Sequence, residues 1–215
     1  MRVDNTNVYS YYIALLYSRN SKGDLPMKEI EKTLNMINDI KQIAQNHPQA
    51  MFYYFLVRAI RANRVIEFGK SFGISTIYLA LALRDNWGGQ LIGTEIHKEK
   101  AKKVILDIET AGLSKYVDIR MGNPIETLKD ISGPVDFLLN DGFPPSALPV
   151  LKLVAPYIRP GGVVVSDNVD PSKADHREYI DYLRKPENGF QSARLELNKR
   201  VEFSIKVSAY EPSIN

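Results

Sequence analysis

At 215 residues, the chain is long enough for one large domain, or for one domain with a short helical extension. Hydrophobic residues make up 44% and charged residues 25%, and no apolar run reaches the length of a membrane span. The absence of cysteine excludes disulfides, thiolate metal sites and cysteine nucleophiles. The N-terminus does not resemble a signal peptide, so we expect a cytoplasmic protein. The net charge of +3 comes from scattered, interleaved side chains and gives no argument for a nucleic-acid partner.

The first part of the chain, residues 1–62, is expected to be a helical extension. Residues 7–17 are rich in aromatic side chains, and residues 27–45 place isoleucine and leucine near helical spacing. Pro48 interrupts this pattern, and an apolar helix is expected over 50–60. The aromatic residues of the extension either line an acceptor pocket or pair two subunits, and we favour a homodimer.

From residue 63 to 210 the pattern changes to short apolar runs that alternate with helical segments. The expected strands are 65–68, 90–94, 117–120, 135–140 and 163–166, and the expected helices between them are 74–83, 98–111, 125–129 and 146–157. Strands that are separated by helical crossovers indicate a parallel, doubly wound sheet. Two further strands, 190–197 and 201–207, are joined by only three residues and must form an antiparallel hairpin. The sequence therefore predicts an α/β fold with a mostly parallel, seven-stranded sheet and a C-terminal hairpin.

The turn after the first strand has the properties of a ligand-binding loop. Gly69 permits a sharp bend, and Gly73 permits a helix to pack closely against the sheet. The spacing Gly-x-x-x-Gly differs from the Gly-x-Gly-x-x-Gly of nicotinamide enzymes, which must bind a pyrophosphate. Glu67 suits a cationic group, and Ser75 suits a carboxylate, as in S-adenosylmethionine. Alternatively, the two glycines serve only the turn.

The end of the second strand supports a nucleoside ligand. Glu95 follows this strand and is expected at the carboxyl edge of the sheet, beside the glycine turn. A carboxylate at this position can accept hydrogen bonds from both ribose hydroxyls. The alternative is an acid that caps the helix beginning at Lys98. The order of the two features favours adenosine binding.

Three motifs resemble the small O-methyltransferases related to catechol and caffeoyl-CoA O-methyltransferases. They are EFGKSFGIST at 67–76, DFLLNDG at 136–142 and PGGVVVSDNV at 160–169. The resemblance covers about residues 50 to 208 in the right order. It implies the Rossmann-like fold of class I methyltransferases, S-adenosylmethionine as cofactor, and transfer of its methyl group to a hydroxyl of a small acceptor.

The resemblance also implies a divalent cation, usually magnesium, bound by an Asp after the fourth strand and an Asp-Asn pair after the fifth. The matching positions are Asp141, which would also be the catalytic residue, Asp167 and Asn168. Three oxygen ligands suit a hard cation and leave positions for two adjacent acceptor oxygens. Without the resemblance, Asp167 and Asn168 would be read as a turn after a strand.

Further positions carry cofactor roles by the same resemblance. Ser71 belongs to the glycine loop, Ile96 is expected near the ribose or adenine, and Asn123 is expected at the adenine edge, where relatives often have aspartate. Phe143 matches a position that is often a large aromatic and would cover the cofactor.

Two departures from the family pattern concern charge and proton transfer. Pro144 stands where one branch of the family has its general-base lysine, and proline cannot accept a proton. Lys173, His176 and His47 are candidate replacements, although each also fits a solvated or capping role. Lys70 lies in a loop where relatives usually have a small hydroxyl residue, and we expect it to point to solvent.

Three functions therefore compete. The favoured one is a metal-assisted O-methyltransferase for a catechol-like or natural-product hydroxyl. A methyltransferase for hydroxylated uridine in tRNA would need a basic patch at the pocket mouth. A catalytically impaired S-adenosylmethionine-binding protein is supported by Pro144 and opposed by the retained cation ligands. A nicotinamide oxidoreductase fits neither the glycine spacing nor the hairpin.

Overall fold

The computed structural model describes residues 47–69, 73–195 and 201–207. The chain divides into two units at Pro48, and the fold presented below is that of the second unit, Gln49–Asn215. The helices expected over 7–17 and 27–45 lie outside the described residues. Among the helices of the described residues, none has the length and apolar character needed to cross a membrane.

A seven-stranded sheet forms the centre of this unit, with the strand order β3-β2-β1-β4-β5-β7-β6. The strands are β1 (Arg64–Phe68), β2 (Gln90–Glu95), β3 (Val117–Met121), β4 (Val135–Asn140), β5 (Ile158–Ser166), β6 (Phe190–Leu195) and β7 (Val201–Lys206). Strands β1 to β5 pair in parallel, whereas β7 pairs antiparallel with both β5 and β6. The expected mostly parallel sheet with its antiparallel hairpin is confirmed.

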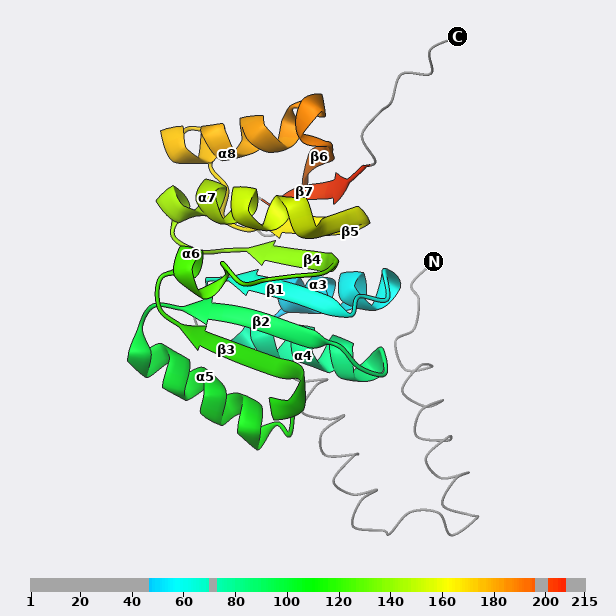
Figure 1. The fold of residues 1–215 in the computed structure, drawn as a ribbon, viewed down its shortest axis with the longest axis vertical. Helices are drawn as coiled ribbons and strands as arrows, with labels where there is room; N and C mark the ends of the chain where they lie inside the picture. Colours follow the sequence, from blue (N-terminus) through cyan, green and yellow to red (C-terminus); the bar gives the residue numbers. More distant parts are fainter. Residues whose placement is uncertain (1–46, 70–72, 196–200, 208–215) are drawn as a thin grey trace. The chain divides into compact units, whose positions relative to one another are not determined.

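Helices cover both faces of the sheet, with α3 and α4 behind the strands and α7 in front of them in Figure 1. The helices are α3 (Pro48–Ala59), α4 (Ile74–Asp85), α5 (Lys98–Thr110), α6 (Pro124–Thr127), α7 (Pro144–Val154) and α8 (Ala174–Arg184). Every residue of β4 is buried, as expected for a central parallel strand covered on both faces. One core cluster joins Ile66 and Leu138 of the sheet to Leu151 of α7 and Leu183 of α8.

The structure corrects the sequence analysis in two places. Helix α8 was not expected, although its buried residues His176, Tyr179, Ile180 and Leu183 follow helical spacing. Strand β5 begins at Ile158, five residues before the expected start, and the helix before it ends at Val154. The Arg-Pro-Gly-Gly sequence was read as the end of a helix, but it lies within the strand, where the register with β4 shifts.

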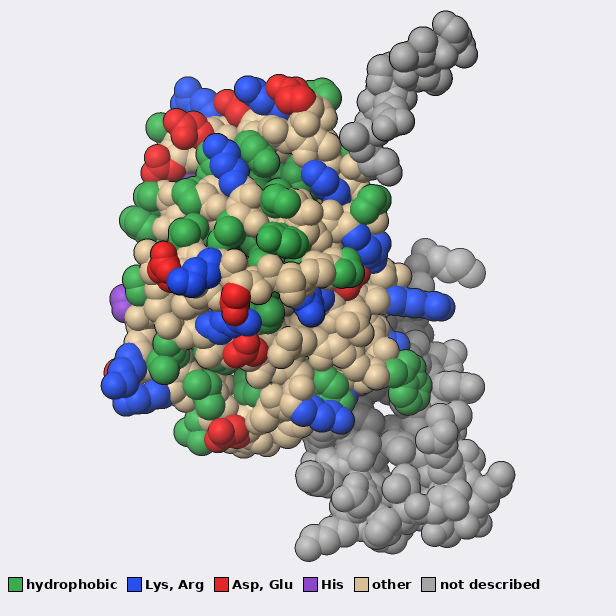
Figure 2. All heavy atoms as spheres, viewed as in Figure 1, with side chains coloured by type: hydrophobic (Ala, Val, Ile, Leu, Met, Phe, Trp, Pro, Cys, Tyr) green, Lys and Arg blue, Asp and Glu red, His purple; other side chains and the backbone are tan. Residues whose placement is uncertain are grey.

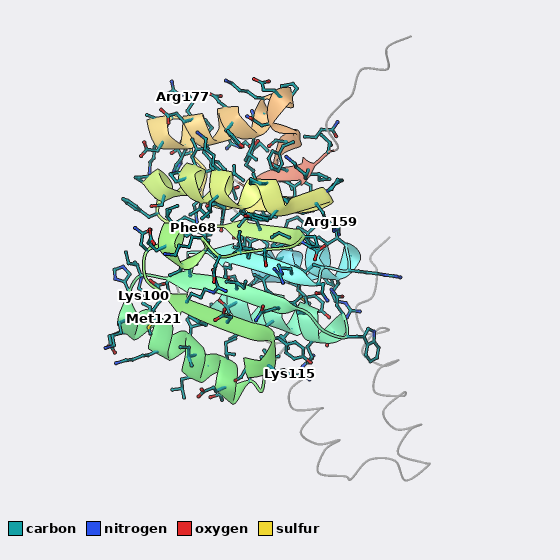
Figure 3. All side chains as sticks on the ribbon, in the orientation of Figure 1. Phe68, Lys100, Lys115, Met121, Arg159 and Arg177 are labelled. Carbon is teal, nitrogen blue, oxygen red and sulfur yellow. The ribbon has the colours of Figure 1, made fainter. Side chains whose placement is uncertain are left out.

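The amino edge of the sheet is held by one buried carboxylate. Asp136 accepts hydrogen bonds from the backbone N–H groups of Asn63 and Arg64, both at 2.8 Å, and from Arg159 Nε at 2.5 Å. Figure 3 places Arg159 at this edge, opposite the edge where Phe68 and Met121 lie. Burial alone would raise the pKa of Asp136, but the hydrogen bonds outweigh burial and lower it. The ionised carboxylate therefore links β1, β4 and β5.

We expect Asp136→Ala to lower the free energy of unfolding by about 3 kcal/mol, because it leaves Arg159 and two backbone donors without their partner. Asp130→Ala is the control, since Asp130 pairs with Arg120 while its side chain is 69% exposed. That change should cost less than about 1 kcal/mol. Urea unfolding measures both, and equal losses would contradict the role given to Asp136.

Candidate active site

The candidate site lies where strand order reverses. Strand β1 pairs with β2 on one side and β4 on the other, so the loops that follow β1 and β4 meet at the carboxyl edge. Gly69, with φ +87°, and Gly142 come so close that a Cβ on Gly69 would lie 2.3 Å from Gly142 Cα. A side chain on Gly142 would in turn meet the Phe68 ring at 2.3 Å. The two loops therefore require glycine at this contact.

Glu67 is fully buried at the end of β1 and is tied to the start of α4. Its carboxylate accepts hydrogen bonds from Ser75 Oγ and, at 2.8 Å, from Thr76 Oγ1. Gly73, with φ +77°, is the residue before α4 and packs against Val104 of α5. Ser75 was expected to bind the cofactor carboxylate, but its hydroxyl donates a hydrogen bond to Glu67. The cofactor roles of these residues stay predictions.

The adjacent strand carries the predicted ribose ligand. Glu95 ends β2 and is 6% exposed, and its Oε1 accepts a hydrogen bond from His97 N at 2.7 Å. The next residue, Ile96, is 65% exposed although it is apolar. An exposed apolar side chain beside a buried carboxylate suits a nucleoside, whose base is flat and whose ribose carries hydroxyls.

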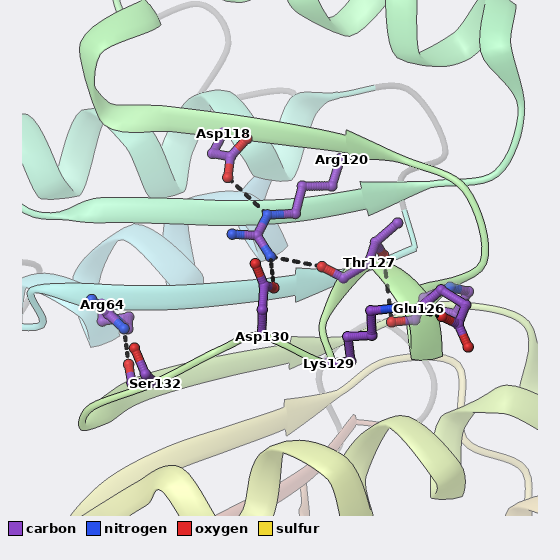
Figure 4. A network of polar contacts seen from close by, with 9 residues as sticks. Arg64, Asp118, Arg120, Glu126, Thr127, Lys129, Asp130 and Ser132 are labelled. Atoms are coloured by element: carbon purple, nitrogen blue, oxygen red, sulfur yellow. Dashed lines mark hydrogen bonds and ion pairs between the residues drawn. The ribbon is translucent and has the colours of Figure 1, made fainter.

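Asn123 lies at the neighbouring strand end and has a structural role. Its Oδ1 accepts a hydrogen bond from Ile125 N at 2.9 Å, which caps helix α6. Arg120 of β3 holds the same segment through Thr127 O at 2.7 Å and through Asp130 (Figure 4). The adenine contact expected of Asn123 stays a prediction.

The loop after β4 enters helix α7 directly. Phe143 is 69% exposed and precedes the helix, and Pro144 is its first residue. Proline is favoured at this position because the missing N–H would have no partner there. Pro144 thus has a structural explanation, and it places no proton acceptor next to Asp141.

The three predicted cation ligands lie together at this edge. Asn168 Nδ2 donates to Asp141 Oδ1 at 3.1 Å, and Asn168 N donates to Asp167 Oδ1 at 2.7 Å. Asn168 adopts a left-handed conformation with φ 58°, which asparagine tolerates better than most residues. The loops that carry Asp141 and Asp167 are fixed by backbone hydrogen bonds to the ends of β1 and β4.

The electrostatics of this cluster favour a bound cation. Burial, and then the charges of Asp167 and Glu67, raise the pKa of Asp141 to about 7, although the hydrogen bond from Asn168 lowers it. In the described part of the chain, no three acidic or histidine side chains gather around one point. The predicted ligand set is two carboxylates and an amide, whose oxygens would suit magnesium if the Asn168 amide turned its oxygen toward the cation.

Tyr53 is a residue of this cluster that the sequence analysis missed. It lies on α3 and is 3% exposed, and its hydroxyl donates to Asp167 Oδ2 at 3.4 Å. Burial first, and then Asp167 and Asp141, raise the pKa of Tyr53 far above its ordinary value. The sequence analysis grouped this tyrosine with the aromatic residues of an acceptor pocket or dimer contact, and no sequence signal linked it to Asp167.

A small cavity lies beside the cluster, between the starts of α7 and α8. It is lined by Asn140, Gly142, Pro144, Ala147, Ser166, Asp167, Val169, His176 and Tyr179. His176 Nδ1 accepts a hydrogen bond from Asp170 N at 2.7 Å, which leaves the proton of the neutral ring on Nε2. In this arrangement His176 is a donor, which argues against it as the general base. Lys173 precedes α8 as its exposed N-terminal flanking residue.

The structure thus brings most of the predicted site residues to one edge of the sheet. The glycine turn, the acid that ends β2 and the predicted cation ligands all lie at the carboxyl ends of β1, β2, β4 and β5. Ser71 and Lys70 lie outside the described residues. The strand order and the antiparallel β7 agree with the Rossmann-like fold expected for class I methyltransferases, in which ligands bind at the carboxyl ends of the strands beside the switch point.

Comparison with known proteins identifies the family. A family model described as a methyltransferase domain matches residues 66–169. A catechol O-methyltransferase from Niastella koreensis is 31% identical over 160 residues, which are 73% of this chain and 66% of that protein. Caffeoyl-CoA O-methyltransferase 2 from Eucalyptus globulus is 26% identical over 193 residues, which are 80% of this chain and 74% of the relative. The chain belongs to the S-adenosylmethionine-dependent O-methyltransferases that include these enzymes.

A solved structure supports the fold assignment. The O-methyltransferase of tomaymycin synthesis from Streptomyces achromogenes, in complex with S-adenosylmethionine, superimposes with a TM-score of 0.68. It is 22% identical, and the match covers 79% of this chain and 89% of that one. The chain spans about two thirds of the length of the Niastella relative.

Proposed function

We propose that the protein transfers the methyl group of S-adenosylmethionine to a hydroxyl of a small acceptor with two adjacent oxygens, assisted by a divalent cation such as magnesium. The observation that carries this proposal is the meeting of Asp141, Asp167 and Asn168 at the switch point of the sheet. These residues would hold the cation. When bound, the cation would lower the pKa of the acceptor hydroxyl.

The reaction forms a bond from the acceptor oxygen to the methyl carbon, breaks the carbon–sulfur bond and releases the hydroxyl proton. The chain must therefore align oxygen and sulfur and favour loss of that proton. In this proposal, Glu95 would hold the nucleoside and the Gly69 turn would hold the methionine moiety. The exposed Phe143 ring would shield the reacting groups from water.

No described side chain beside Asp141 fits the place of the usual lysine base. Pro144 begins α7, and His176 Nδ1 already accepts a backbone hydrogen bond. We infer that proton loss depends on the cation rather than on a dedicated base. The same observation favours the second candidate, a protein that binds S-adenosylmethionine without efficient transfer.

A tRNA substrate receives less support. In Figure 2 the visible face carries lysine and arginine side chains interleaved with aspartate and glutamate, without a broad basic patch. On α5, Lys102 pairs with Glu99 and Lys103 with Asp107. Mixed charge of this kind gives little attraction to a phosphate backbone.

The test is transfer of a labelled methyl group to a panel of ortho-dihydroxy aromatic compounds, with magnesium and with EDTA. We expect labelled product with magnesium and its loss with EDTA. Equal product in EDTA would contradict cation assistance. Cofactor binding without product from any acceptor of the panel would favour the impaired binding protein.

A further inference from the structure

A hydrogen-bonded chain connects helix α3 to the predicted cation ligands. Gln49 Nε2 donates to the Tyr53 hydroxyl oxygen at 2.7 Å, and the Tyr53 hydroxyl donates to Asp167 Oδ2 at 3.4 Å. The tyrosine ring is buried, so its position is fixed by packing. The contact joins residues 114 positions apart in the sequence.

The direction of these hydrogen bonds fixes the Asp167 carboxylate. Gln49 donates to the phenol oxygen, so the phenol hydrogen is left to point toward Asp167. The other carboxylate oxygen, Oδ1, accepts from Asn168 N at 2.7 Å. Both oxygens of Asp167 are thus held by donors from different parts of the fold. Each oxygen retains a lone pair for a further partner.

We propose that Tyr53 is a positioning residue that orients Asp167 for cation binding, with Gln49 orienting the phenol. This inference rests on the proposed cation-assisted function. Hydrogen bonds to ligating carboxylates from a surrounding shell set the orientation of the ligand, and their removal commonly lowers metal affinity by about 10–100-fold. Helix α3 would thus contribute two side chains, Tyr53 and Gln49, that support the predicted cation site.

The same helix supplies a matched control. Tyr54 is the next residue, and its hydroxyl donates to Asp85 Oδ2 at 2.8 Å, at the end of α4. Tyr54→Phe and Tyr53→Phe remove the same hydroxyl from neighbouring residues, and only Tyr53 is bonded to Asp167. A general effect of losing a tyrosine hydroxyl on α3 would affect both variants alike.

The experiment is calorimetric titration of the full chain and its variants with manganese, together with the melting temperature in EDTA. We expect Tyr53→Phe to weaken manganese binding about tenfold and Tyr54→Phe to leave it unchanged. Gln49→Leu should weaken binding less than Tyr53→Phe. The double variant should be no weaker than Tyr53→Phe alone, because both changes break one chain.

Two results would overturn the inference, and they differ in what else they contradict. Manganese binding by Tyr53→Phe as tight as wild type would overturn the role of Tyr53 and leave the proposed function intact. Absence of binding by the wild-type protein would overturn both the inference and the proposed cation. If Tyr53→Phe melts at too low a temperature for calorimetry, the manganese affinity of Gln49→Leu tests the inference instead, because that variant keeps the buried tyrosine ring. Wild-type affinity in Gln49→Leu would then contradict the role of the hydrogen-bonded chain.

Discussion

Asp141→Asn is expected to abolish cation binding and at the same time to stabilise the cation-free protein. The change removes a partly buried negative charge that is repelled by the charges of Asp167 and Glu67. The amide oxygen of the new side chain can still accept the hydrogen bond from Asn168. We expect a loss of manganese affinity of more than about 100-fold and a gain of a few kcal/mol in unfolding free energy in EDTA.

The gain in stability should depend on pH with a defined sign. The unfolded Asp141 carboxyl ionises near its ordinary pKa of 3.8, whereas the folded one keeps its proton to about pH 7. The wild-type group therefore contributes most to stability below the unfolded pKa and loses that contribution as pH rises to 7. The advantage of Asp141→Asn should grow between these values and then level off.

Asp130→Asn is the control for the Asp141 prediction, because it removes an exposed carboxylate that pairs with Arg120 and makes no contact with Asp141, Asp167 or Asn168 among the hydrogen bonds and ion pairs of the described residues. It should change neither manganese affinity nor stability in EDTA by more than about 0.5 kcal/mol. Wild-type manganese affinity in Asp141→Asn, or a lower stability in EDTA, would contradict the charge cluster described above.

Among substitutions in the glycine turn, Gly69→Ala is expected to lower the free energy of unfolding most. The new methyl group would lie 2.3 Å from Gly142 Cα, and the backbone there has φ +87°. A left-handed backbone costs about 1–2 kcal/mol for alanine, and overpacking against fixed backbone adds about 1–3 kcal/mol. We therefore expect a loss of about 2–5 kcal/mol and a loss of cofactor binding.

Gly112→Ala is the control that separates the cost of the left-handed backbone from the cost of overpacking. Gly112 also has a positive φ, +69°, but a methyl group there meets no atom within 4 Å. Its cost should be only the backbone part, about 1–2 kcal/mol, with cofactor affinity unchanged. If the two alanine variants unfold at the same denaturant concentration, the close approach of the two loops does not constrain the site.

The fold was predictable from the sequence because its signals are local. Most of the parallel strands contain a short apolar run, although β3 alternates apolar and charged residues. The expected three-residue connection at 198–200 is too short for a helical crossover, so the last two strands were predicted as a hairpin. Helix α8 was not predicted because the charged residues of its exposed face, Asp175, Arg177 and Glu178, interrupt the buried apolar residues along the sequence. The start of β5 was missed because Pro160 and Gly161 ordinarily end elements, whereas here they occupy a register shift.

The site was only partly predictable. Strand ends can be read from the sequence, so Glu95, Asp141 and Asp167 could be placed at one edge. Hydrogen bonds that depend on tertiary packing, such as the one between Tyr53 and Asp167, have no signal in the local sequence. The hydrogen bond from the Ser75 hydroxyl to Glu67 could not be predicted from the sequence for the same reason. A serine at this position is equally consistent with the start of a helix and with a contact to the cofactor carboxylate.

The measurement that tests the central claim most directly is calorimetric titration of the full chain with S-adenosylmethionine and with S-adenosylhomocysteine, in magnesium and in EDTA. The fold, the glycine turn and Glu95 predict that both nucleosides bind in the micromolar range. If neither binds under either condition, the assignment of this site to methyl transfer is contradicted.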